Sequence, residues 1–175
     1  MARTRTPVVS GWFTEDTPEP DVTPDPGPGP AVAPAAAPGA APPGAFRLLG
    51  TQCSACTAVF FPREDAFCRN PRCPGDGVLA EVPLSPRGRV WSYTDGRYRP
   101  PAPYVSDPGA PWEPYTLVAV ELEAEGMVVL GQAAPGVGVG DLSVGMEVEV
   151  VGGVLGEDAD TTWLTWQFKP VGGAS

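Results

Sequence analysis

Four cysteines are the residues whose type and spacing indicate chemistry in this chain. They form two close pairs, Cys53/Cys56 and Cys68/Cys73, and the sequence contains no other cysteine. Two thiolates on one tight turn can bind a metal ion, and a second such turn completes a tetrahedron. The pattern therefore predicts a structural zinc site with four sulfur ligands, held in a rubredoxin-like zinc ribbon.

The same four thiolates could hold iron, which would make the protein a rubredoxin-like electron carrier. We favour Zn²⁺, because a ribbon attached to a second domain has a structural use for a closed metal site. Four sulfur ligands leave zinc no open position for a substrate, so we predict no catalytic residue at the metal.

Composition excludes several classes of function. The chain has no histidine, which removes the commonest general base and the Ser-His and Cys-His nucleophile pairs. Its formal net charge is −10, whereas nucleic-acid binding depends on neutralising phosphates with Lys and Arg. We therefore predict that the protein is not an enzyme by itself. An acidic nucleic-acid-binding module remains an alternative that retention on heparin or single-stranded DNA would reveal.

The N-terminal sequence has no apolar run of the length found in signal peptides. The Ala-rich stretch 31–45 is broken repeatedly by Pro and cannot span a bilayer as a helix. We expect no membrane association and a cytoplasmic location, where paired cysteines favour metal over disulfide.

The elements that must position the cysteines are predicted to be strands. After residue 46 no segment has a helical period, and short β-branched and aromatic runs alternate with Gly and Pro turns. The fold class is mainly β: a zinc ribbon followed by a small oligonucleotide/oligosaccharide-binding (OB) barrel. The predicted organisation is an N-terminal arm (1–16), a disordered Pro/Ala/Gly-rich linker (17–45), the ribbon (46–83), the barrel (84–170) and a tail (171–175).

A second set of residues has the composition of a partner-binding surface, in which Tyr, Trp and Arg are enriched. Aromatic residues occur in the arm and in the Pro-rich segment 98–115, which could instead pack on its own barrel. The arginines before and within that segment have two interpretations. They form a basic site that binds a CoA phosphate or a partner, or they lie on the solvated surface. The candidate contacts are Trp12, Phe13, Arg89, Tyr93, Arg97, Tyr98, Arg99, Tyr104, Trp112 and Tyr115.

The whole pattern resembles the zinc-ribbon/OB-fold acyl-CoA-associated proteins of domain-of-unknown-function family 35. The matching pieces are GWFTED at 11–16, Leu49-Gly50, CSAC, FFP at 60–62, FCRNPRC, RGRVWSYT at 87–94 and DLSVGMEVEV at 141–150. Two features depart from the family pattern. The insertion 17–45 separates GWFTED from the ribbon, and the second cysteine pair encloses four residues instead of two.

The resemblance implies a non-catalytic auxiliary subunit in a hetero-oligomer. Its partner would be a thiolase-like enzyme of the lipid-transfer-protein type, acting on acyl-CoA as a thiolase or retro-aldolase. Degradation of steroid side chains and of aromatic acyl-CoA are examples of such pathways. The subunit would stabilise the partner and help to form its substrate channel, with acyl-CoA near the interface.

Overall fold

The computed structural model describes residues 3–14, 46–99, 101, 109 and 111–172 of the 175-residue chain. The predicted linker 17–45 lies outside these residues. In the described part, regular structure consists of nine strands and one short 3-10 helix, so the chain is mainly β as predicted. None of its helices is long and apolar enough to cross a bilayer.

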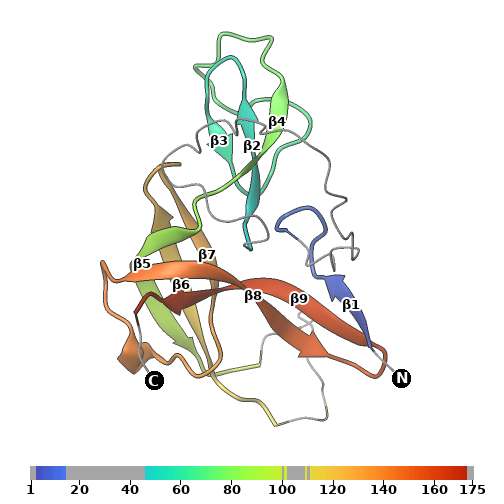
Figure 1. Cartoon of the computed structure of the whole chain (residues 1–175), viewed down its shortest axis with the longest axis vertical. Coiled ribbons are helices and arrows are strands. Elements are labelled where there is room, and N and C mark those ends of the chain that lie inside the picture. Colours follow the sequence, from blue (N-terminus) through green and yellow to red (C-terminus); the bar gives the residue numbers. More distant parts are fainter. Residues whose placement is uncertain (1–2, 15–45, 100, 102–108, 110, 173–175) are drawn as a thin grey trace, which may run out of the picture.

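The ribbon is a three-stranded antiparallel sheet with the strand order β3-β2-β4. Its strands are β2 (Leu49–Cys53), β3 (Val59–Phe60) and β4 (Leu79–Pro83). The sheet stands over one end of the larger sheet (Figure 1). Cys53 is the last residue of β2, and the loops that follow β2 and β3 carry the other three cysteines, so the small sheet positions the metal site.

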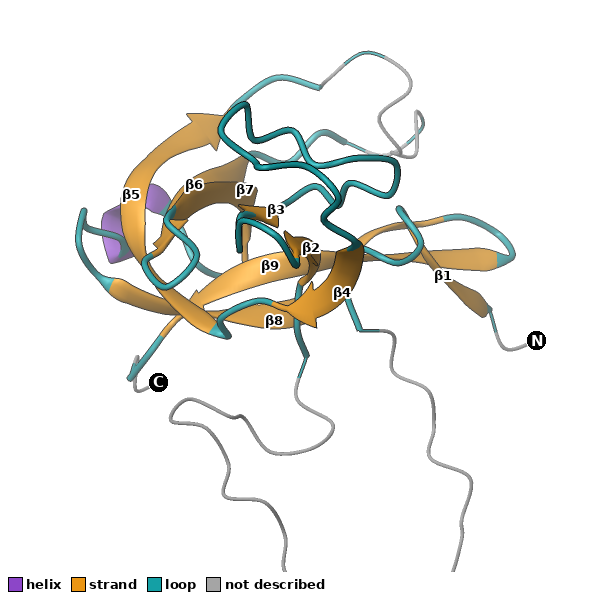
Figure 2. Ribbon diagram, turned by 90° about the horizontal axis from the view of Figure 1, so that it is seen from above, coloured by secondary structure: helices purple, strands orange, loops and turns teal. Residues whose placement is uncertain are grey.

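The larger sheet has six strands in the order β1-β9-β7-β6-β5-β8, and an additional β9–β8 pairing closes five of them into a barrel. The barrel strands are β5 (Arg87–Gly96), β6 (Tyr115–Leu122), β7 (Met127–Ala133), β8 (Glu147–Glu157) and β9 (Thr161–Pro170). Only the β7–β9 pair in the ring is parallel. This is the OB-type barrel that the sequence predicts, and Figure 2 shows its strands curving around a ring.

Alternating side chains fill the barrel. In β6 every second residue is buried, beginning with Thr116 and ending with Leu122. The strand therefore reads as a half-buried element with one face inward. The 3-10 helix η1 (Val139–Asp141) lies in the Gly-rich segment before β8, where no regular element was predicted.

The N-terminal arm is part of the fold. Its strand β1 (Thr4–Pro7) pairs in parallel with the first half of β9, beyond the closed ring (Figure 1). The following residues reach the ribbon, where Phe13 forms an antiparallel bridge with Leu48. The arm thus contacts both sheets.

Candidate metal centre

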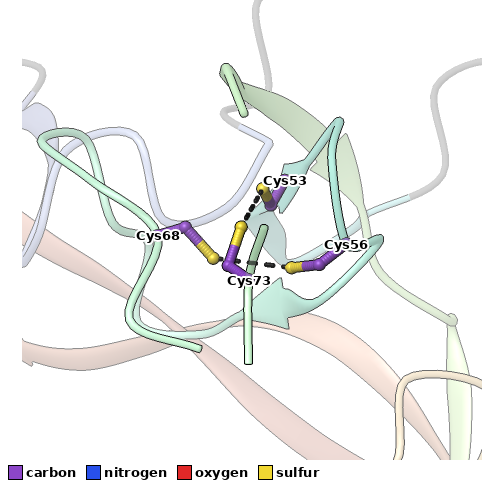
Figure 3. Close-up of side chains that lie close together, drawn as sticks. All are labelled: Cys53, Cys56, Cys68 and Cys73. Carbon is purple, nitrogen blue, oxygen red and sulfur yellow. Dashed lines mark hydrogen bonds between the residues drawn. The ribbon is translucent and has the colours of Figure 1, made fainter. Parts of the chain in front are cut away.

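The four cysteine sulfurs converge on one point, as Figure 3 shows. All four lie within 4.8 Å of one another. The Sγ atoms of Cys53 and Cys73 are 3.8 Å apart, and those of Cys56 and Cys68 are 3.5 Å apart. A Zn–S distance of about 2.3 Å places sulfurs about 3.8 Å apart in a regular tetrahedron, so the geometry and the donor set fit a zinc ion.

The first pair of ligands is positioned by the turn that ends β2. The carbonyl of Cys53 accepts a hydrogen bond from the N–H of Thr57 at 2.8 Å, and Thr57 has a positive φ of 59°. Ser54 is tied to Val78 in both directions, at 3.0 Å each. These bonds hold Cys53 and Cys56 on the same side of one turn.

Asn70 shapes the second, longer pair. Its carbonyl accepts a hydrogen bond from the N–H of Cys73 at 2.9 Å, and its side-chain oxygen accepts one from the N–H of Arg72 at 3.0 Å. This turn folds the chain back so that Cys73 returns to Cys68. The four-residue spacing is therefore compatible with the site.

Hydrogen bonds and mutual interaction set the proton affinities of the thiols. The backbone of Ala58 and the side chain of Asn70 lower the pKa of Cys56 to about 6. The Asn70 backbone lowers the pKa of Cys68, but burial and the neighbouring thiols raise it to about 12. A metal ion must therefore displace thiol protons when it binds all four sulfurs.

Gly77 closes the site on the side of β4. A Cβ atom at this position would lie 2.3 Å from the sulfur of Cys53 and 2.9 Å from the Cβ of Ala55. Real atoms do not approach so closely, so the close packing of the loops around Cys53 requires glycine. Neither Gly77 nor Asn70 is among the predicted site residues, although the dipeptide Asn70-Pro71 is typical of a turn.

The predicted contacts in the arm, Trp12 and Phe13, pack on their own chain. Phe13 is only 2% exposed and belongs to the core, so its ring offers no surface to a partner in this fold. Trp12 is half-buried and packs against Phe61 of the ribbon and Trp166 of the barrel, with ring centroids 5.6 and 6.1 Å away. The arm therefore joins the ribbon to the barrel.

The predicted basic residues have partners within the chain. Arg89 donates to the carbonyl of Gly145 at 3.1 Å, and Arg97 pairs with Asp95 at 2.7 Å. The guanidinium of Arg99 lies 5.8 Å from the ring centre of Trp112. Their contact with CoA or with a partner remains a prediction.

The predicted tyrosines and Trp112 differ in their exposure and in their contacts. Tyr93 is half-buried against the barrel core, whereas Tyr98 is exposed. Trp112 and Tyr115 form an edge-to-face pair with ring centroids 5.5 Å apart. Tyr104 lies outside the described residues. Contact of these residues with a partner remains a prediction.

Three comparisons relate the chain to known proteins. Residues 42–79 match a family described as "ChsH2, rubredoxin-like zinc ribbon domain". A "DUF35 domain-containing scaffold protein" of Methanocaldococcus jannaschii is 32% identical over 126 residues, which cover 71% of this chain and 82% of the relative. A protein of the same name from Methanothermobacter thermautotrophicus is 32% identical over 130 residues, covering 73% of this chain and 87% of the relative.

A solved structure named "Ltp2-ChsH2(DUF35) aldolase" superposes with a TM-score of 0.49 and 26% sequence identity, covering 71% of this chain and 84% of that chain. The zinc-ribbon match and the convergent sulfurs together confirm the predicted structural zinc site. Because the chain is 32% identical to two DUF35 proteins and covers more than four fifths of each, it belongs to the DUF35 family of zinc-ribbon proteins.

Proposed function

We propose that this protein is a non-catalytic scaffold subunit that binds a thiolase-fold enzyme acting on acyl-CoA. The observation that carries the proposal is the family: two relatives, of which this chain covers 82% and 87%, are named scaffold proteins. A scaffold protein holds its partners in a fixed geometry. The ribbon and the barrel pack against each other, so their surfaces together can bind a partner in one orientation.

The chemistry of the metal centre supports the same role. Four thiolates complete the tetrahedron of a zinc ion, so substrate has no coordination position. Binding of zinc contributes on the order of 10–16 kcal/mol to the folding of such sites. The metal therefore fixes the shape of the ribbon, and the chemistry belongs to the partner.

The finer proposal is a hetero-oligomer in which the subunit stabilises a thiolase or retro-aldolase and borders its substrate channel. The test is to mix the zinc-loaded chain with purified thiolase-fold proteins of the source organism and to measure the mass of any complex. We expect a defined complex whose acyl-CoA turnover exceeds that of the partner alone, while the chain alone has none. The proposal fails if no thiolase-fold protein binds.

A second candidate is an electron carrier, because the matched domain is rubredoxin-like and four thiolates also bind iron. Metal analysis and the visible spectrum of protein purified without chelator separate the two candidates. Zinc and no visible absorption support the scaffold, whereas iron and a red colour would select the carrier.

A further inference from the structure

The outer face of the neighbouring strands β5, β6 and β7 carries a group of exposed apolar side chains. Trp91, Leu130 and Val128 are 58%, 58% and 48% exposed. The strand register places Ala119 of β6 between Ser92 of β5 and Leu130 of β7. We call the residues Trp91, Ala119, Val128 and Leu130 the β5–β7 face.

A β-bulge presents the tryptophan on this face. The register of β5 and β6 shifts between Val90 and Ser92. Val90 is buried in the barrel, whereas Trp91 and Ser92 are both exposed, so the extra residue turns the indole towards solvent. Contiguous exposed apolar groups mark interaction sites on soluble proteins, and Trp is enriched among the residues that dominate binding energy.

A shallow hollow of about 400 Å³ adjoins the face where β5 begins and β6 ends. Its charged lining is three carboxylates and two guanidinium groups: Glu121, Glu123, Glu147, Arg87 and Arg89. Arg87 lies 3.8 Å from Glu147, and Arg89 donates to a backbone carbonyl. Within the described residues Glu121 and Glu123 make no ion pair, so their carboxylates remain available to a basic group.

We propose that the β5–β7 face docks a partner protein that presents an apolar surface beside an Arg or Lys side chain. The apolar contact would cover Trp91 and Leu130, and the basic group would enter the hollow beside Glu121 and Glu123. A second copy of the chain fits less well, because each copy carries a net charge of −10. Nucleic-acid phosphates would meet the same carboxylates.

The inference rests on the proposed function, for which it supplies the docking surface. The test titrates the zinc-loaded full chain with the thiolase-fold proteins of the source organism, each purified singly. The double variant Trp91→Ser/Leu130→Ser removes the apolar contact, and Glu123→Lys reverses one charge of the hollow. Val144→Ser is the matched control, since Val144 is 71% exposed and lies outside the face. Zinc content and thermal unfolding establish that all variants fold.

We expect the double variant to bind roughly 30-fold or more weakly, as for loss of a hot-spot residue. We expect Glu123→Lys to bind more weakly and with a smaller salt dependence, and Val144→Ser to bind within about threefold of wild type. If wild type binds a thiolase-fold protein and the double variant binds equally well, the surface is wrong but the scaffold function stands. If wild type binds none of them, the scaffold function fails and this inference fails with it. Self-association, or binding to single-stranded DNA, that the double variant abolishes would assign the face to that other occupant.

Discussion

At the scale of single residues, the metal centre depends on the lack of a side chain at Gly77 as well as on its four ligands. Gly77 leaves the space in which the sulfur of Cys53 lies, so Gly77→Ala should displace that ligand. We expect a lower zinc affinity, measured by competition with a chromophoric chelator. Gly140→Ala is the control, because nothing lies within 4 Å of the added Cβ. Equal zinc affinity of both variants would contradict the packing argument.

Asp158 is a second residue with a local and measurable role. Its carboxylate accepts hydrogen bonds from the N–H groups of Asp160 and Thr161, at 3.0 and 2.7 Å, and from the indole of Trp163 at 3.2 Å. These bonds lower the pKa of Asp158 below its ordinary value. The stabilisation they give to the β8–β9 turn is therefore present at neutral pH and is lost as the pH falls through the lowered pKa.

Two measurements check this expectation. The indole N–H resonance of Trp163 should shift on acidification with a midpoint below the ordinary carboxyl pKa. In Asp158→Ala the acid-dependent shift should be absent, and the amide of Thr161 should exchange faster at neutral pH. An indole resonance that titrates at the ordinary carboxyl pKa would be inconsistent with the hydrogen bonds.

At the scale of elements, the N-terminal arm packs against both sheets and joins them. Phe13 lies 5.4 Å from Phe46 and 6.1 Å from Trp166 between ring centroids, inside the common core. Phe13→Ala should therefore lower the free energy of unfolding by about 3–5 kcal/mol. Urea denaturation of the zinc-loaded protein measures this loss. Phe67→Ala is a matched control, because Phe67 is 67% exposed and its truncation should cost little.

How far the sequence predicts these elements depends on the range of the interactions that form them. Strand β6 (Tyr115–Leu122) was predictable, because a short run of β-branched and apolar residues bounded by turns favours a strand without help from distant contacts. Strand β1 was not predicted, because Thr4–Pro7 is polar and its pairing with β9 joins the two ends of the chain. Strand β8 runs on through Gly152. At that position the Phe46 ring lies 3.0 Å from the place that a Cβ atom would take, which is another contact between distant parts of the sequence.

The same distinction applies to the candidate sites. The four cysteines were predictable, because ligand type and spacing alone specify a tetrahedral thiolate site. The burial of Phe13 was not predictable, because it depends on Leu48 and Trp166, which lie far from it in the sequence. The sequence does not single out Val128 and Leu130, and it is the strand register that places them on one face with Trp91.

At the scale of the whole molecule, the metal is coupled to the barrel through aromatic contacts. Phe61 of the ribbon packs edge-to-face on Trp166 of β9 at 5.7 Å and also on Trp12. Removal of zinc should unfold the ribbon, because the metal ion links the two loops that carry the thiols. We expect a change in tryptophan fluorescence together with retained β-sheet circular dichroism from the barrel. Restored fluorescence on adding zinc is the control, and an unchanged spectrum after complete chelation would refute the coupling.

Thr14 and Arg47, which lie on either side of the inserted segment, are neighbours in the fold. The N–H of Thr14 donates to the carbonyl of Arg47 at 2.8 Å, and the N–H of Arg47 donates to Oγ1 of Thr14 at 2.9 Å. A short connection can therefore join these two residues without moving either. Replacing 16–45 by four Gly/Ser residues shortens the closed loop, and each halving of its length is worth about 0.6 kcal/mol.

We therefore expect the shortened chain to keep its zinc and to gain about 1.5 kcal/mol of stability against urea. A permuted 16–45 segment of unchanged length is the control, and it should leave stability and zinc content as they are. Lower stability of both variants would mean that the segment contacts the fold through its specific sequence. Unchanged binding of the thiolase-fold partner by the shortened chain would assign partner recognition to the ribbon, arm and barrel, whose surfaces the deletion leaves intact.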